Sequence, residues 1–115
     1  MQIVDNKSRV SLSELQKMAT DTFGDLVKAV VDVKLAIMAI DAELHADEEA
    51  LLMDNGSDQN DLWGINLYPD IEGADFIEFD SMINLRPSRG NRSRGVEDPK
   101  VRDQIKKIVA DLVMR

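Results

Sequence analysis

The chain has 115 residues, 43% of them hydrophobic, which is enough for one hydrophobic core and too short for two ordinary domains. It has no cysteine, which excludes disulfides and thiolate zinc sites and gives no sign of an oxidising compartment. The formal net charge of −8 argues against general affinity for duplex nucleic acid or anionic lipid, because the field of the whole molecule repels polyanions.

The N-terminal part of the chain predicts an arm, a helix and a strand. Residues 1–10 are interpreted as an arm or a short edge strand, and residues 11–115 as a single domain. Ser11 and Glu14 form an S-x-x-E capping box, so we expect a helix that begins there and ends near Gly24. Residues 26–33 fit either a helix or a strand, and their four valines favour the strand.

Residues 36–44 alternate between apolar and polar side chains, which predicts a second strand. Its inward phase carries Met38, Ile40, Ala42 and Leu44. A tight connection at 34–35 would pair it with the preceding strand in a hairpin. Asp47 is a suitable N-cap for a short helix that ends near 55–56.

The C-terminal half predicts two further strands and the clearest helix. Residues 63–68 and 77–86 alternate as strands do. Asp98 and Pro99 predict a helix start, followed by an apolar face of Val101, Ile105, Ile108 and Leu112. The predicted order is α-β-β-α-β-β-α. We therefore expect an α+β fold with about four antiparallel strands and the helices packed on one face of the sheet.

Several short motifs resemble a small bacterial domain family of unknown function. They are E-L-H-A-D at 43–47, G-S at 56–57 with Gln59, D-L-W-G-x-N-x-Y-P at 61–69, I-N-x-R-P at 83–87 and G-N-R-S at 90–93. The resemblance runs from about residue 11 to the end of the chain. It implies one intact domain, but it supplies no activity and no catalytic residues. The chain departs from the family at residues 35–36, because relatives often carry glycine near the first hairpin turn.

The loop at 86–95 is the first candidate site, because charge is segregated along the chain. Residues 35–85 contain 13 acidic side chains and no Lys or Arg, whereas residues 81–96 contain four arginines and no acid. Guanidinium groups match phosphate or carboxylate, and glycines let backbone N–H groups turn towards an anion. The alternative is a solvated loop that pairs with the acidic body. The candidate residues are Arg86, Arg89, Asn91, Arg92 and Arg94.

A second candidate is an acidic sheet face with the one histidine. Alternation places Asp41, Glu43 and His45 on one face of a strand, and Glu78 and Asp80 on the outer face of another. Neighbouring strands would bring these groups together as ligands for a divalent ion. The simpler interpretation is a solvated polar face, and we favour it.

Two classes of function remain. The first is a small binding or regulatory module whose arginine-rich loop recognises a small anionic ligand or an acidic partner protein. The second is a small metal-dependent hydrolase at the acidic face. We favour the binding module, without a cofactor, because the charge segregation is evident and a catalytic set is not. No signal peptide pattern or long apolar run is present, so we expect a cytoplasmic protein with no membrane segment. The ligand, the pathway and the oligomeric state do not follow from the sequence.

Overall fold

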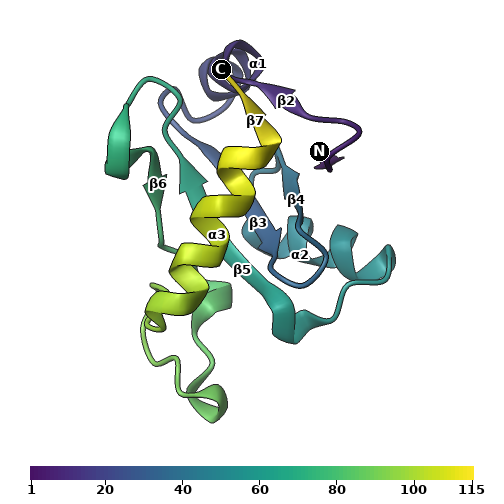
Figure 1. Cartoon of the computed structure of the whole chain (residues 1–115), viewed down its shortest axis with the longest axis vertical. Coiled ribbons are helices and arrows are strands. Elements are labelled where there is room, and N and C mark those ends of the chain that lie inside the picture. Colours follow the sequence, from purple (N-terminus) through teal and green to yellow (C-terminus); the bar gives the residue numbers. More distant parts are fainter.

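The computed structural model describes all 115 residues and confirms the α+β class. Its main sheet is antiparallel and has five strands in the order β1-β4-β3-β5-β6 (Figure 1). The strands are β1 (Gln2–Val4), β3 (Val27–Asp32), β4 (Ile37–Ile40), β5 (Leu62–Leu67) and β6 (Ile77–Glu78). A second, parallel pair joins β2 (Val10–Ser11) to β7 (Val113–Met114). This pair ties the N-terminal arm to the last residues of the chain.

Three helices complete the fold: α1 (Leu12–Asp21), α2 (His45–Asp54) and α3 (Pro99–Leu112). The predicted capping box at the start of α1 is confirmed, since the Ser11 hydroxyl accepts the N–H of Glu14 and the Glu14 carboxylate accepts the N–H of Ser11. On α3, Ile105, Ile108 and Leu112 are buried as expected. None of the three helices is long and apolar enough to pass through a membrane.

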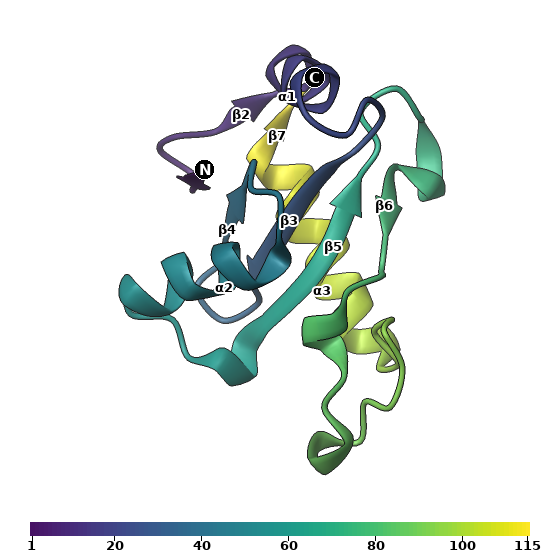
Figure 2. The same cartoon turned by 180° about the vertical axis from the view of Figure 1, so that it is seen from behind.

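The helices cover both faces of the sheet, which corrects the prediction that they share one face. Side chains of α1 and α3 join the main core together with Ala29 and Val31 of β3. On the opposite face, Leu52 of α2 packs with Val30 and Leu62. Figure 2 shows α2 in front of the sheet and α3 behind it. The reason is that β3 buries consecutive residues rather than alternate ones, so both of its faces need a cover.

The predicted strand at 36–44 is shorter than expected. It ends at Ile40, and Asp41 has a φ of +69°, which breaks the alternation of side chains. The chain then enters α2 at His45, two residues before the predicted cap at Asp47. As a result Leu44 is exposed, and Asp41 and Glu43 do not share a strand face with His45.

The predicted strand at 77–86 is also shorter, because it ends at Glu78. Two 3₁₀ turns follow, η3 (Met82–Asn84) and η4 (Pro87–Arg89). The hydroxyl of Ser81 accepts the N–H of Ile83, which is local capping that competes with a sheet ladder. This bend places η3 against β5 on the face that α2 also covers.

Candidate functional site

The loop at 86–95 is held from the inside by Asn91. Its amide nitrogen donates to the carbonyl oxygens of Asn84, Ser93 and Gly95, and its Oδ1 accepts the N–H of Glu97 at 2.9 Å. The side chain is buried. Asn91 therefore uses its hydrogen-bonding groups within the protein, and we leave it out of the site that we propose below.

Two backbone N–H groups of the loop already donate hydrogen bonds to a carboxylate of the protein itself. The carboxylate of Glu97 accepts the N–H groups of both Arg92 and Ser93. These bonds hold the pKa of Glu97 below its usual range. The Arg92 guanidinium makes no hydrogen bond or ion pair within the protein and lines neither of the two hollows described next. The anion-binding turn predicted for this loop is thus filled by the chain itself.

Arg86 and Arg89 line a hollow of about 450 Å³ beside η4. The Arg86 guanidinium carbon lies 5.0 Å from the centre of the Trp63 ring, and Nη2 lies 3.5 Å from a carboxylate oxygen of Glu49. Its Nη1 is buried and has no hydrogen-bond partner. Burial lowers the pKa of Arg86 below the ordinary arginine value. Arg89 donates from Nη1 to the carbonyl oxygen of Asn60 at 3.1 Å.

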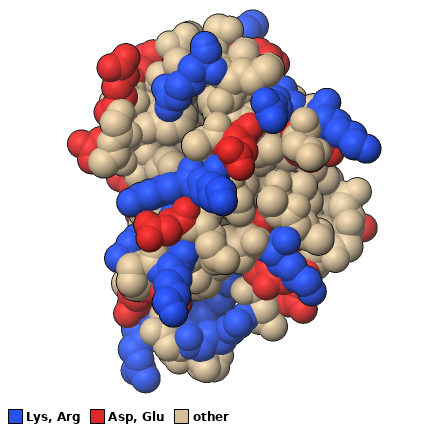
Figure 3. Space-filling model, in the orientation of Figure 1, with Lys and Arg blue, Asp and Glu red and all other residues tan.

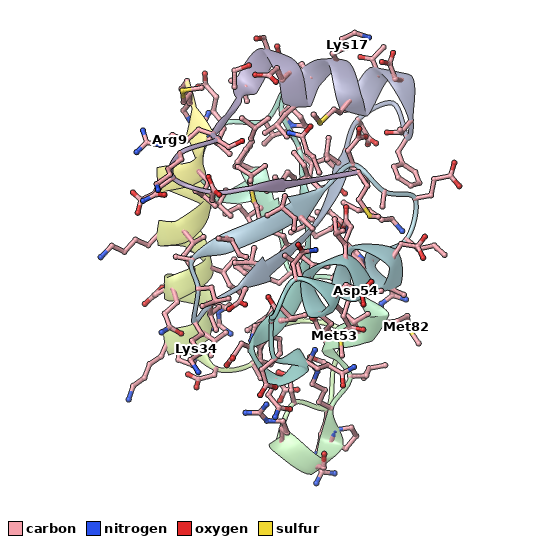
Figure 4. The ribbon with its side chains drawn as sticks, turned by 90° about the vertical axis from the view of Figure 1, so that its right-hand side faces the viewer. Arg9, Lys17, Lys34, Met53, Asp54 and Met82 are labelled. Atoms are coloured by element: carbon pink, nitrogen blue, oxygen red, sulfur yellow. The ribbon has the colours of Figure 1, made fainter.

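A second, smaller hollow of about 210 Å³ lies on the other side of η3. Its polar lining includes Lys28, His45, Asn66, Asp80 and Arg94. Arg94 donates from Nε to Asp80 at 2.6 Å, so this arginine of the loop pairs with the acidic body. Met82 and Ile83 line both hollows and separate them. Met82, labelled in Figure 4, is well exposed at this side of the molecule.

His45 lies at the first turn of α2 with its ring inside the protein. Its Nε2 lies 2.7 Å from the carbonyl oxygen of Ile65. Because a carbonyl can only accept, Nε2 carries the proton and Nδ1 is the accepting nitrogen. Burial lowers the pKa of His45 below 6.5, although the bond to Ile65 opposes the shift. The imidazole is therefore neutral at pH 7.

The five residues predicted for a metal site do not converge. His45 and Asp80 line the same hollow, and Glu78 lies next to it, where it accepts hydrogen bonds from Asn66 and Tyr68. Asp41 lies in the turn after β4, and Glu43 lines a different hollow. The structure holds no group of three or more His, Asp or Glu side chains placed to bind a metal ion. This arrangement does not support the hydrolase alternative.

Two features of this face were missed from the sequence. Gln59 and Asn60, in the loop before β5, line the Arg86 hollow. Glu48 of α2 is fully buried. A signal for Glu48 was present, because it lies three residues after His45 and four before Leu52, on one helical face.

Three comparisons with known proteins yield one match, to a family model. Searches of the curated proteins and of the solved structures gave no match. A family model matches residues 2–112, nearly the whole chain, and the chain therefore belongs to the family described as "Protein of unknown function (DUF5674)".

Proposed function

We propose that the protein is a small binding module that recognises a phosphate or carboxylate group in the hollow lined by Arg86 and Arg89. The observation that carries the proposal is the Arg86 guanidinium. It is held against Trp63, its side chain is only 12% exposed, and Nη1 lacks an acceptor. A buried donor without an acceptor costs free energy. Binding of a ligand anion is therefore favoured if the Arg86 guanidinium shifts so that Nη1 donates to it.

The remaining lining of the hollow also supports an anionic ligand. Arg89 is exposed at its rim and adds a second positive charge. Ser88, Gln59 and Asn60 contribute polar groups. Glu49 is the only acid in the lining, and its distance of 3.5 Å from Arg86 is long for a charge-assisted hydrogen bond. Two arginines against one glutamate leave the hollow with a net positive charge.

The surface around the loop fits the same proposal. Figure 3 shows the face covered by α3, where several Lys and Arg side chains, with some Asp and Glu among them, lie at the lower end; Figure 1 places the loop and the first turn of α3 there. The rest of the chain is acidic, with a formal net charge of −8 overall. A single phosphate or carboxylate group can approach this end with little repulsion, whereas a long polyanion would also meet the acidic body.

The single tryptophan provides the test, because Trp63 is in contact with Arg86. We would titrate the protein with inorganic phosphate and with a tetraglutamate peptide at constant ionic strength, and record the Trp63 emission. We expect a saturable change with at least one probe. The two probes distinguish a phosphate ligand from the acidic surface of a protein partner.

Arg89→Ala and Arg92→Ala form a matched pair for this experiment. Both remove one exposed arginine from the same loop, but only Arg89 lines the hollow. We expect the first variant to weaken binding by about tenfold, since one charge-assisted contact is lost, and the second to leave it nearly unchanged. Equal losses in both variants would show a diffuse charge effect. No saturable change with either probe would also contradict the proposal.

A further inference from the structure

The smaller hollow beside His45 is separated from the hollow at Arg86 by Met82 and Ile83. We propose that it binds a free amino acid, with the ammonium group facing the acceptors of Asn66, His45 and Asp80 and the carboxylate facing Arg94. The protein leaves several hydrogen-bonding atoms around this hollow without partners.

Asn66 presents an acceptor and nothing else. Its amide nitrogen donates to the Glu78 carboxylate at 2.8 Å and lies 3.4 Å from the carbonyl oxygen of Asp80. These two acceptors fix the orientation of the amide, so its other atom is the oxygen. That Oδ1 is buried and has no partner, and the residue is only 7% exposed. A buried oxygen in this state requires an N–H or O–H donor.

His45 and Asp80 add two more acceptors to the same lining. The proton of the imidazole is used by Ile65, so Nδ1 offers a lone pair and makes no hydrogen bond within the protein. Asp80 uses only Oδ1 for Arg94, which leaves Oδ2 available. An ammonium group carries three donors and one positive charge, and it satisfies an amide oxygen, an imidazole nitrogen and a carboxylate together.

The donors around the hollow require an anionic group on the same ligand. Only the Nε of Arg94 has a partner, so its two terminal nitrogens are unused. Lys28 also lines the hollow; its Nζ lies over the ring of Phe23 and has no carboxylate partner. The α2 helix also begins here without a side-chain cap, which leaves the N–H groups of His45 and Ala46 without a capping oxygen. Cationic and accepting groups in one small hollow suit a zwitterion.

The single histidine makes the site directly observable. We would record the imidazole ¹⁵N and ¹H signals of His45 while adding glycine, L-serine or L-glutamate, and compare them with N-acetylglycine, which has a carboxylate but no ammonium group. We expect saturable shifts with at least one free amino acid and none with N-acetylglycine. Absence of any saturable shift up to about 10 mM, or equal shifts with N-acetylglycine, would overturn the proposal.

A matched pair of variants tests the role of Asp80, which in the proposal accepts the ammonium group and also holds Arg94 in place. Asp80→Asn keeps the shape of the side chain and removes its charge, and we expect affinity to fall at least tenfold. Asp103→Asn, on an exposed position of α3, removes the same charge elsewhere and is expected to have no effect. If Asp80→Asn does not fold, the comparison of glycine with N-acetylglycine on the unchanged protein still decides the question. Because His45 reports this hollow and Trp63 the other, failure at one site is distinguishable from failure at the second.

Discussion

The carboxyl group of Glu48 accepts the backbone N–H of Ala42 through Oε2 at 3.1 Å, in a position that is fully shielded from solvent. Its second oxygen, Oε1, has no partner. Burial raises the pKa of Glu48 to about 9, and the hydrogen bond from Ala42 only partly opposes this shift. The side chain is therefore protonated and neutral in the folded protein at pH 7.

This raised pKa predicts that the protein loses stability as pH rises. The unfolded chain releases the proton near pH 4.5, whereas the folded chain holds it until about pH 9, so the stabilising contribution is full below pH 4.5 and disappears towards pH 9. We expect the free energy of unfolding to fall by about 2 kcal/mol between pH 7 and pH 9, at up to about 1.4 kcal/mol per pH unit. Urea denaturation at pH 7, 8 and 9 measures it.

Glu48→Gln isolates the cause, because glutamine is neutral at every pH and keeps an oxygen for Ala42. In this variant the free energy of unfolding should no longer fall between pH 7 and pH 9, and the variant should be more stable than the parent at pH 9. Glu43→Gln, which changes an exposed glutamate just before α2, should keep the slope of the parent. His45 does not contribute to the change between pH 7 and pH 9. Because its pKa is lowered, its contribution to the free energy of unfolding is present above pH 6.5 and is lost at lower pH. An unchanged slope in Glu48→Gln would show that the carboxyl is ionised when folded.

The first hairpin shows how far sequence patterns reach. The valines at 26–33 predicted β3 correctly, because β-branched side chains are stiff at χ1 and pack well on a pleated sheet. The pattern could not show that β3 is buried on both faces, since that depends on where α2 docks. The pattern also could not show where β4 ends. Apolar and polar residues continue to alternate in the sequence beyond Ile40, but the backbone turns at Asp41.

Ala36, in the turn of this hairpin, has a φ of +57°, a conformation that costs an L-residue about 1 kcal/mol or more. Ala36→Gly should therefore stabilise the protein by about 0.5 kcal/mol, after the larger entropy of glycine in the unfolded chain is subtracted. Ala110→Gly, in the helical backbone of α3, is the control and should instead destabilise by about 1 kcal/mol. Chemical denaturation of both variants checks the prediction, and equal losses would show that the turn is not strained.

Gly64 on β5 allows the close approach of the segment that separates the two hollows. A Cβ at this position would lie 2.5 Å from both side-chain atoms of Ser81. Gly64→Ala should therefore destabilise the protein by about 2 kcal/mol, because η3 must move away from the strand. Adding Ser81→Gly should recover part of the loss, as the two clashing atoms are removed. Thermal melts decide the matter, and a Gly64→Ala melting temperature equal to that of the parent would contradict the close packing.

The candidate site was predicted only in part, for a reason that the loop makes clear. Charge segregation made residues 86–95 a candidate, but arginines that are equivalent in the sequence have different surroundings in the fold. Arg86 packs on Trp63, Arg94 pairs with Asp80 across 14 residues, and Arg92 has no ion-pair partner. Such pairings depend on the path of the chain between the two partners. The 3₁₀ turns η3 and η4 determine this path, and local sequence patterns do not reveal it.

Asn91 provides the sharpest test of how this loop is built. Its amide closes four hydrogen bonds to the backbone, and it is 4% exposed. Asn91→Ala would leave several buried carbonyl and N–H groups without partners, each at a cost of about 1 kcal/mol or more. We expect a loss of about 2–4 kcal/mol in the free energy of unfolding, or local opening of the loop, seen as faster hydrogen exchange at 91–97.

Arg92→Ala serves as the control in the same loop, because that side chain makes no contact that holds the backbone, and its free energy of unfolding should change by less than about 0.5 kcal/mol. Phosphate or tetraglutamate binding to Asn91→Ala should weaken as the loop opens, since Arg89 is then no longer held beside the hollow. A variant with lost binding but the stability and exchange rates of the parent would mean that Asn91 contacts the ligand directly. Asn91 would then be a binding residue, as predicted from the sequence, and the loop would have to rearrange when the ligand binds.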